Sequence, residues 1–228
     1  MITELDAQLI SVGTDKKERI VVNIEGEDKE FVSNALAKEY GHTFSSESVT
    51  PNTAYPGRLL DVGKVGYGLY VDIGVIDSPR MDALIPLHKL REQLSLAGPL
   101  RTVAEAFLLV DYLPVNVRLT SIDLYNSKLE AEFDRETLSR MASWLKDDHE
   151  RLLVFGANRT QIESSLKKVG HREDIYEIEQ LGKFEFSLRC KRSTRASGIL
   201  AAIGPRLRGV PMHLFIPKEL EEKQNAKA

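Results

Sequence analysis

Five short apolar segments, separated by glycine, proline, aspartate and asparagine, follow one another between residues 57 and 133. Segments of this length with turn residues between them are typical of β-strands. Five strands in so short a stretch favour a small closed barrel. Residues 56–134 are therefore predicted to form such a barrel, from GRLLDVG, YGLYVDIG, DALIPL, LPVNVRLTSID and KLEAEF.

The stretch GKVGYGLYVDIG, residues 63–74, contains glycines that could either bind phosphate or bend a strand. A phosphate-binding loop places its glycines before a helix, and a Walker loop adds lysine followed by serine or threonine. Here the glycines precede the alternating LYVDIG, and neither GKS nor GKT occurs in the chain. Glycines within a strand pattern mark bulges and bends. The stretch is predicted to be a bending strand.

Residues 1–50 are predicted to form a hairpin followed by a helix. The strands, 7–13 and 19–24, surround the polar turn TDKKE. Residues 42–53 lack periodicity and are interpreted as a linker or an extended arm. The helix, in GEDKEFVSNALAKEYG, has an apolar stripe and a glycine C-cap, namely Phe31, Ala35, Leu36, Tyr40 and Gly41.

The remaining chain alternates strand and helix patterns. A connecting helix is predicted within 135–150, and 151–218 are predicted to form a βαββαβ domain of the ferredoxin-like type. Asn158 and Ser193 are the expected N-caps of its two helices. The charged residues 219–228 are expected to form a flexible tail. The fold class is α+β: an N-terminal hairpin and helix, a central five-stranded OB-type barrel, and a C-terminal βαββαβ domain.

The formal charge of −3 conceals an uneven distribution. Residues 151–228 carry 15 basic and 9 acidic side chains, whereas residues 1–150 carry 16 and 25. Within 186–218 there are seven basic side chains and no acidic one. Such a division predicts that a polyanion or an acidic partner docks on the C-terminal domain.

Several classes of function are not expected. The single cysteine, Cys190, excludes an internal disulfide and favours a reducing compartment, so a cytoplasmic location is predicted. The apolar runs are too short to cross a bilayer, and no membrane association is expected. The five histidines show no HxH or HxxxH spacing and GxSxG is absent, so no metal, no cofactor and no catalysis are predicted.

The barrel segments PGRLLDVGKVGYGLYVDIGV, DALIPLHKL and LPVNVRLTSIDLYNSKLEAEF together resemble the S-one RNA-binding repeat, an OB-fold barrel. The resemblance implies that Tyr67 and Tyr70 are the two aromatics of the second strand and that Asp123 lies where the fourth strand turns. The histidine of that repeat falls on Pro86, with His88 two positions later. This departure, and an excess of 11 acidic over 8 basic side chains in 56–134, weaken the prediction of RNA binding.

The whole chain also resembles an archaeal family of uncharacterised proteins built around such a barrel. The segments that carry this resemblance are GEDKEFVSNALAKEYG, VGYGLYVDIG, ALIPLHKLREQL and LGKFEFSLRCKRSTRASGILAAIG. It implies an archaeal origin and a three-part architecture, and it transfers no activity.

The barrel carries one candidate RNA-binding surface. Tyr67 and Tyr70 could stack on bases or pack in the core, and strand alternation places them on opposite faces unless the strand bulges. Arg118 and Lys64, expected on neighbouring strands, could contact phosphates or be ordinary surface charges. His88 is a further candidate through the resemblance.

The C-terminal domain carries a second candidate surface. In RCKRSTRASG a strand ends in basic residues and a helix is predicted to begin at Ser193 or Thr194. Free backbone N–H groups and the cations of Lys191, Arg192 and Arg195 would then converge on a phosphate. Arg206 and Arg208 are placed at the far end of the helix, where they would also stabilise its negative pole.

Three functions remain open from the sequence. The first is a non-catalytic RNA-binding protein of the translation or transcription machinery, with the ribosome or RNA polymerase as partner. The second is a protein-binding adaptor whose barrel has lost RNA affinity. The third is a small-molecule sensor or enzyme that uses the βαββαβ domain.

Overall fold

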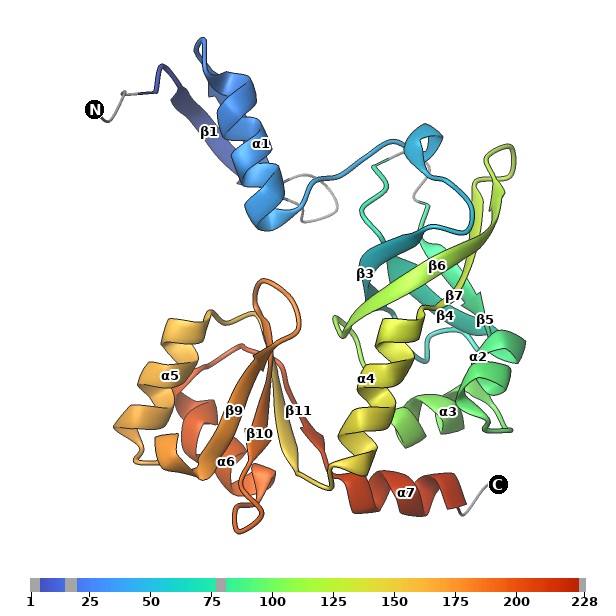
Figure 1. Cartoon of the computed structure of the whole chain (residues 1–228), viewed down its shortest axis with the longest axis vertical. Helices are drawn as coiled ribbons and strands as arrows, with labels where there is room; N and C mark the ends of the chain where they lie inside the picture. Colours follow the sequence, from blue (N-terminus) through green and yellow to red (C-terminus); the bar gives the residue numbers. More distant parts are fainter. Residues whose placement is uncertain (1–4, 15–19, 77–80, 226–228) are drawn as a thin grey trace. The chain divides into compact units, whose positions relative to one another are not determined.

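The computed structural model describes residues 5–14, 20–76 and 81–225, and the chain separates into two compact units, Met1–Thr43 and Phe44–Ala228 (Figure 1). The fold class is α+β, as the sequence predicts. The smaller unit contains a hairpin and a helix. The larger unit contains a closed five-stranded barrel and a four-stranded antiparallel sheet.

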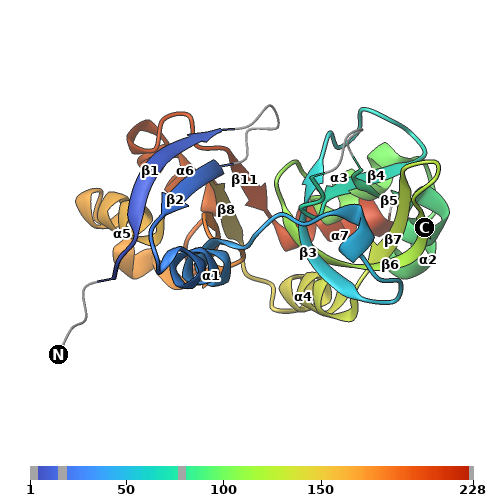
Figure 2. The same cartoon turned by 90° about the horizontal axis from the view of Figure 1, so that it is seen from above.

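The smaller unit is a hairpin of β1 (Gln8–Thr14) and β2 (Ile20–Glu25), followed by α1 (Lys29–Tyr40). Figure 2 shows the two strands side by side with the helix next to them. The predicted turn lies mostly outside the described residues. Gly41 ends the helix with a positive φ of 79°, and its N–H donates to the carbonyl of Ala37 at 2.8 Å. None of the described residues of this unit is buried, so the apolar stripe of α1 has no core beneath it.

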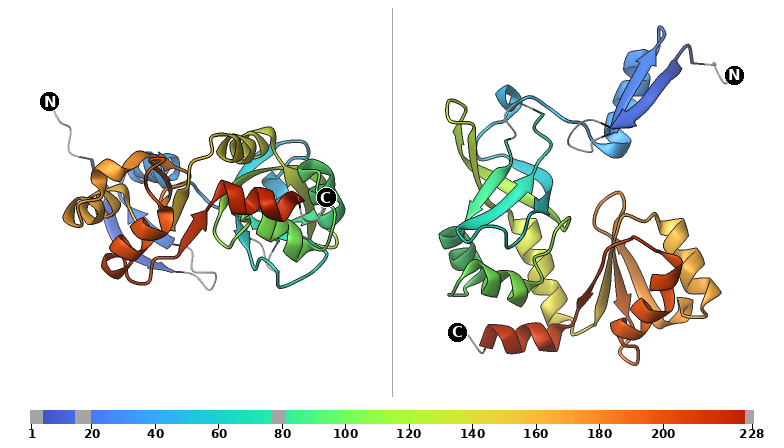
Figure 3. Two further views of the ribbon diagram at one scale, coloured as in Figure 1. Left: turned by 90° about the horizontal axis from the view of Figure 1, so that it is seen from below. Right: turned by 180° about the vertical axis from the view of Figure 1, so that it is seen from behind.

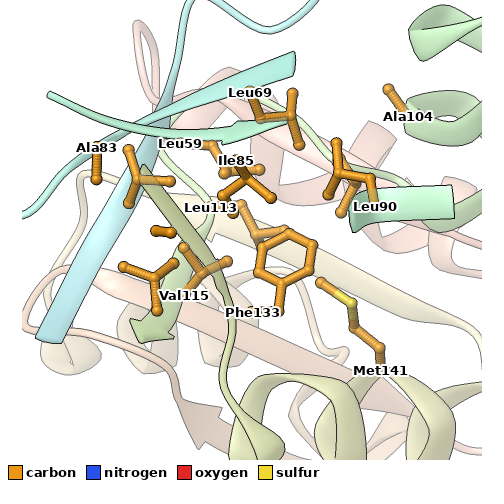
Figure 4. Packing of buried hydrophobic residues seen from close by; sticks show 14 of the residues in the cluster. Leu59, Leu69, Ala83, Ile85, Leu90, Ala104, Leu113, Val115, Phe133 and Met141 are labelled. Carbon is orange, nitrogen blue, oxygen red and sulfur yellow. The ribbon is translucent and has the colours of Figure 1, made fainter. Parts of the chain in front are cut away.

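The barrel strands close in the order β3-β4-β5-β7-β6. The parallel pair β5–β7 and the antiparallel pair β3–β6 give the strand order of an OB fold. Figure 4 shows apolar side chains from these strands, among them Leu59, Leu69, Ile85 and Phe133, pointing toward one another. The strand bounds are Ala54–Leu60 (β3), Gly68–Asp72 (β4), Ala83–Pro86 (β5), Pro114–Asp123 (β6) and Lys128–Phe133 (β7).

Two glycines allow close approach between neighbouring strands. A Cβ atom at Gly68 would lie 2.4 Å from the carbonyl oxygen of Ile85 on β5. At Gly57 it would lie 2.7 Å from Cγ1 of Val71 and 2.8 Å from the carbonyl oxygen of Asp72, both on β4. Real Cβ atoms are not found at such distances, so these positions require glycine.

The sequence analysis does not anticipate two helices between β5 and β6. They are α2 (Leu87–Leu94) and α3 (Leu100–Phe107), and they begin directly after Pro86 and Pro99. Leu90 of α2 and Val103 of α3 are fully buried in the barrel core. The stretch interpreted as a linker also contacts the barrel. Phe44 forms a bridge with Val75, Ser46–Ser48 form a short 3-10 helix (η1), and Val49 is buried.

The connecting helix α4 (Arg135–Lys146) follows β7 and is capped by Asp134, whose carboxylate accepts from the N–H of Thr137 at 2.7 Å. The hydroxyl of Thr137 accepts from the N–H of Asn116 at 2.8 Å and donates to its carbonyl at 3.0 Å. These bonds fix the first turn of α4 to β6.

The C-terminal sheet has the strand order β11-β8-β10-β9 with antiparallel pairs throughout, which is the ferredoxin-like arrangement of a βαββαβ chain. Helices α5 and α6 cover one face (Figure 3). Asn158 caps α5 in a capping box with Gln161, as predicted. The prediction for Ser193 is wrong: α6 begins at Ala196, and Arg195 occupies the cap position. The bounds are Arg151–Phe155 (β8), Arg159–Lys168 (α5), Arg172–Asp174 (η2), Ile175–Gln180 (β9), Glu185–Cys190 (β10), Ala196–Ile203 (α6), Gly204–Arg206 (η3) and Met212–Phe215 (β11).

The end of the chain differs from the expected flexible tail. Pro217–Asn225 form α7, which lies along α3 (Figure 1). Leu220 is buried, and the side-chain amide of Gln224 donates to the carbonyl of Ala106 at 3.0 Å. One apolar core includes the barrel residues, Leu220, and Leu153, Phe155 and Phe215 of the sheet. The barrel and the sheet therefore share a core.

A buried guanidinium joins the C-terminal sheet to α4 and the residue that follows it. Arg151, with 3% of its side chain exposed, donates to the carboxylates of Asp147 and Glu179, the latter at 3.2 Å. The ring of Trp144 lies 5.0 Å from its Cζ atom, and the indole N–H donates to Glu179 at 3.1 Å. Two carboxylates and an aromatic ring thus compensate a charge that water cannot reach.

Replacing Arg151 by alanine is expected to lower the free energy of unfolding by about 3 kcal/mol or more, because it removes the shared partner of two carboxylates in a desolvated site. Urea denaturation measures this change. The matched control is Arg101→Ala, which breaks a solvent-exposed pair with Glu105 and should leave the free energy of unfolding nearly unchanged. Equal stability of the two variants would contradict the assigned role of Arg151.

The strands of the smaller unit should exchange their amide hydrogens much faster than the barrel strands, because a two-stranded hairpin without a buried core is marginally stable in water. Hydrogen exchange followed by mass spectrometry of the full chain compares β1 and β2 with β4 and β5. Slow exchange throughout β1 and β2 would contradict this expectation.

Candidate nucleic-acid interface

Tyr67 and Tyr70 form a pair on the barrel surface. Their hydroxyl oxygens lie 2.7 Å apart, and their rings meet edge to face with centroids separated by 6.3 Å. Tyr67 lies one residue before β4 begins, so strand alternation does not separate the two rings. Tyr67 is 55% exposed, which leaves its ring accessible from solvent.

The contact between these phenols changes the acidity of one of them. The hydrogen bond with Tyr67, assisted by burial, raises the pKa of Tyr70 from 10.0 to about 12. Hydrogen bonding and desolvation both favour the neutral form of Tyr70. Tyr70 is therefore uncharged at neutral pH and presents no anion that would repel phosphate.

Lys64 precedes Tyr67 in the same loop, and His88 lies on the helix whose first residue is bound to the backbone of Tyr67. Lys64 is in the loop between β3 and β4 and pairs with Asp61, Nζ to Oδ2, at 3.1 Å. His88 is exposed on the first turn of α2. The carbonyl of Tyr67 accepts from the N–H of Leu87 at 2.8 Å, so the backbone next to His88 holds the backbone of Tyr67.

Arg118 does not join this group. It is paired in register with Ala54, at the start of β3, whereas Lys64 follows the end of that strand. Six residues of extended strand separate these two ends by roughly 20 Å. The guanidinium of Arg118 binds Glu132, which Lys89 also approaches at 3.7 Å. The expectation that Arg118 and Lys64 lie on neighbouring strands is therefore corrected.

The predicted phosphate site at the start of α6 is already occupied by a carboxylate of the chain itself. Glu150 accepts from the N–H of Ala196 at 2.7 Å through Oε2 and from Nη1 of Arg195 at 2.5 Å through Oε1. This carboxylate satisfies the free N–H group and the cation that were expected to bind phosphate. The prediction of a free anion site there is wrong, because Glu150 approaches from a distant part of the sequence.

The other C-terminal cations remain on the surface. Lys191 and Arg192 follow β10 and are exposed, as are Arg206 in η3 and Arg208 just after it. None of these four side chains forms an ion pair with an acidic residue of the described ranges. They remain available for a polyanion.

Tyr125 and Tyr176 are strongly exposed and were not predicted as site residues from the sequence. Tyr125, at the tip of the β6–β7 hairpin, is 96% exposed, and Tyr176, on β9, is 65% exposed. In an OB barrel, the loop between the last two strands belongs to the ligand-binding surface. Its polar turn sequence, DLYNSK, was the signal that could have identified Tyr125.

The described residues offer little for catalysis or for metal binding. Cys190 is buried, and desolvation raises the pKa of its thiol to about 12, which leaves it protonated and unreactive. No group of three metal-ligating side chains occurs among the residues that the structure describes. Within the same ranges, every helix is too short or too polar to reach across a bilayer.

Comparison with known proteins identifies two family domains. Residues 49–145 match the DUF2110 central domain and residues 149–214 match the DUF2110 C-terminal domain. The first range contains the barrel and nearly all of α4, and the second contains almost the whole sheet. No curated protein matches the chain.

Solved structures give only distant similarities. An a/eIF2alpha–aDim2p–rRNA complex from Pyrococcus horikoshii OT3 has 8% identity and a TM-score of 0.28, over 54% of this chain and 64% of that one. A multidomain protein with nucleic acid binding domains from Streptococcus pneumoniae has 9% identity and a TM-score of 0.23, over 94% and 51%. The chain spans less than two thirds of either structure, and these scores are too low to support a shared fold.

Removing the hydroxyl of Tyr67 should lower the pKa of Tyr70 toward 10.0, because the hydrogen bond that favours the neutral phenol is lost. The raised pKa stabilises the folded wild type fully below pH 10, and this contribution disappears as the pH rises from about 10 to about 12. Phenolate absorbance, titrated in wild type and Tyr67→Phe, measures the shift. Tyr70→Phe should remove the late-titrating phenol, and a late-titrating phenol that persists unchanged in Tyr67→Phe would refute the coupling.

Proposed function

The chain belongs to the DUF2110 family, through both its central and its C-terminal domain, and we propose that it is a non-catalytic RNA-binding protein that holds single-stranded RNA on its barrel. The observation that carries the proposal is the exposed Tyr67–Tyr70 pair at the start of the second barrel strand. In OB folds, the second and third strands and the adjoining loops are the surface that binds oligonucleotides.

The geometry of the pair suits base stacking. A base laid on the ring of Tyr67 gains roughly 1–3 kcal/mol, and the gain does not depend on which base it is. The hydrogen bond to Tyr70 and the backbone bond to Leu87 hold Tyr67 in place, so little conformational freedom is lost on binding. His88 follows Leu87 in the chain, and Lys64 precedes Tyr67 by three residues, so both are candidates for contacts to the flanking phosphates.

The two candidate surfaces differ in whether their cations are paired with carboxylates. The barrel cations Lys64 and Arg118 are paired with carboxylates, so stacking contributes most of the affinity on the barrel. Phosphate contacts come mainly from the unpaired cations of the C-terminal domain, namely Lys191, Arg192, Arg206 and Arg208. Arg195 contributes less, because Glu150 neutralises it.

The cellular setting is part of the proposal. The resemblance of the barrel to the S-one repeat supports a role with the ribosome, a ribosomal RNA precursor or the transcription apparatus, in the cytoplasm of an archaeon. Sedimentation of the native protein with ribosomal particles, abolished by ribonuclease, would support this setting.

One observation favours the alternative, a protein-binding adaptor. Carboxylates hold the barrel cations in at least three pairs, Lys64–Asp61, Arg118–Glu132 and Arg58–Asp72, and the barrel carries an excess of acidic side chains. A basic protein would be attracted to such a surface, whereas RNA would not. Sedimentation in a complex that is indifferent to ribonuclease would favour this function.

Replacing Tyr67 by alanine should weaken the binding of a fluorescent oligouridine by about 5- to 150-fold, which is the loss of one stacked base. Fluorescence anisotropy at two salt concentrations measures the affinity. The matched control is Tyr40→Ala, which removes an exposed tyrosine from α1 and should leave the affinity unchanged. If wild-type protein binds no single-stranded RNA, or if both variants bind equally well, the barrel is not the RNA-binding surface.

A further inference from the structure

Tyr176 projects from the C-terminal sheet because β9 bulges at this residue. Arg189 of β10 pairs with Glu177, and the next residue, Cys190, pairs with Ile175, so Tyr176 has no partner across the strands. A bulge of this kind redirects a side chain. The result is a large aromatic ring that is 65% exposed on an edge strand.

The ring of Tyr176 is held on one side by a fixed cation. Cζ of Arg189 lies 4.4 Å from the ring centroid. The guanidinium is itself bound by Glu177 at 3.2 Å and by Asp147 at 3.5 Å. The ring of His149 lies 6.1 Å away and is fixed by a contact of 2.8 Å between its Nδ1 and the carbonyl of Cys190. The ring is therefore pre-organised, and its exposed surface can accept another flat group at low entropic cost.

Two cations lie on the turn that follows β10, next to the start of β9. Lys191 and Arg192 follow directly after Cys190, whose neighbour across the strands is the residue before Tyr176. The backbone N–H of Lys191 donates to the carbonyl of Asp174 at 2.9 Å, which holds the cation-bearing turn beside the start of β9. Neither side chain forms an ion pair with an acidic residue in the described part of the chain.

We infer that this edge of the C-terminal sheet is a second binding site for single-stranded RNA, in which a base stacks on Tyr176 and the flanking phosphates contact Lys191 and Arg192. An exposed aromatic ring with exposed cations on the neighbouring turn matches the alternation of base and phosphate along a single strand. The bases of a duplex are stacked on one another and would not reach the ring. This inference rests on the proposed function and adds to the barrel a second contact on the same RNA.

The test uses the full chain and an oligouridine carrying 4-thiouridine. Tyr176→Ala should weaken binding of a long oligouridine by about 5- to 150-fold, whereas Tyr176→Phe, which keeps the ring, should bind as wild type does. Photo-crosslinking should label the peptide that contains Tyr176. The double variant K191E/R192E should reduce the slope of log affinity against log salt by about 0.7 for each lost phosphate contact.

The matched control is Phe184→Ala, which removes another exposed aromatic from the β9–β10 hairpin and should change neither affinity nor crosslinking. Melting temperatures of all variants show whether the fold is intact. If Tyr67→Ala weakens RNA binding while Tyr176→Ala does not, and no crosslink to the Tyr176 peptide forms, the inferred site at Tyr176 is refuted and the barrel site stands. If Tyr176→Ala impairs only the binding of a partner protein, the surface recognises protein and the assignment to RNA is overturned. If wild type binds no RNA, both proposals fail.

Discussion

The buried guanidinium of Arg151 is the interaction on which the larger unit depends. Its partners come from different elements: Trp144 and Asp147 belong to α4 or follow it, Glu179 lies on β9, and Ser187 on β10. A buried charge tolerates few arrangements, because each lost partner leaves a group unsatisfied away from water. Helix α4 is therefore held at one angle to the sheet. Since Thr137 ties the other end of α4 to β6, the barrel and the sheet form one body.

The two proposed RNA contacts gain from this rigidity in the same way. A strand that binds one surface finds the second at a fixed distance, so the second contact costs little additional entropy. The surfaces differ in chemistry. The barrel offers an aromatic pair, and the barrel cations Lys64 and Arg118 are already bound by carboxylates, whereas the sheet edge offers an aromatic ring and exposed cations on the neighbouring turn. The affinity of the barrel surface for RNA should therefore be less sensitive to salt than the affinity of the sheet edge.

The sequence predicts elements whose signals are local. Alternation and turn residues locate the five barrel strands, and capping residues locate α5, because neighbouring residues determine these features. Helices α2 and α3 escape prediction since each has eight residues, too few to display a clear period. The wrong prediction of a free phosphate site at the start of α6 has another cause. Glu150, which occupies that site, lies 45 residues before Arg195, and only the folded sheet brings the two together. Tyr67 and Tyr70 share a face because the strand begins after Tyr67, a boundary that alternation alone does not reveal.

The carboxylate of Glu150 at the start of α6 has a consequence for selectivity. Because it is tethered to the chain, it competes with any incoming anion at an effective concentration on the order of millimolar or above. Free phosphate and nucleotides, which commonly bind at helix N-termini, would have to displace it. A polymer that makes several contacts elsewhere has no such need. The carboxylate therefore disfavours small anions at the start of α6, and it leaves the exposed side chains of Lys191 and Arg192 accessible to long ligands.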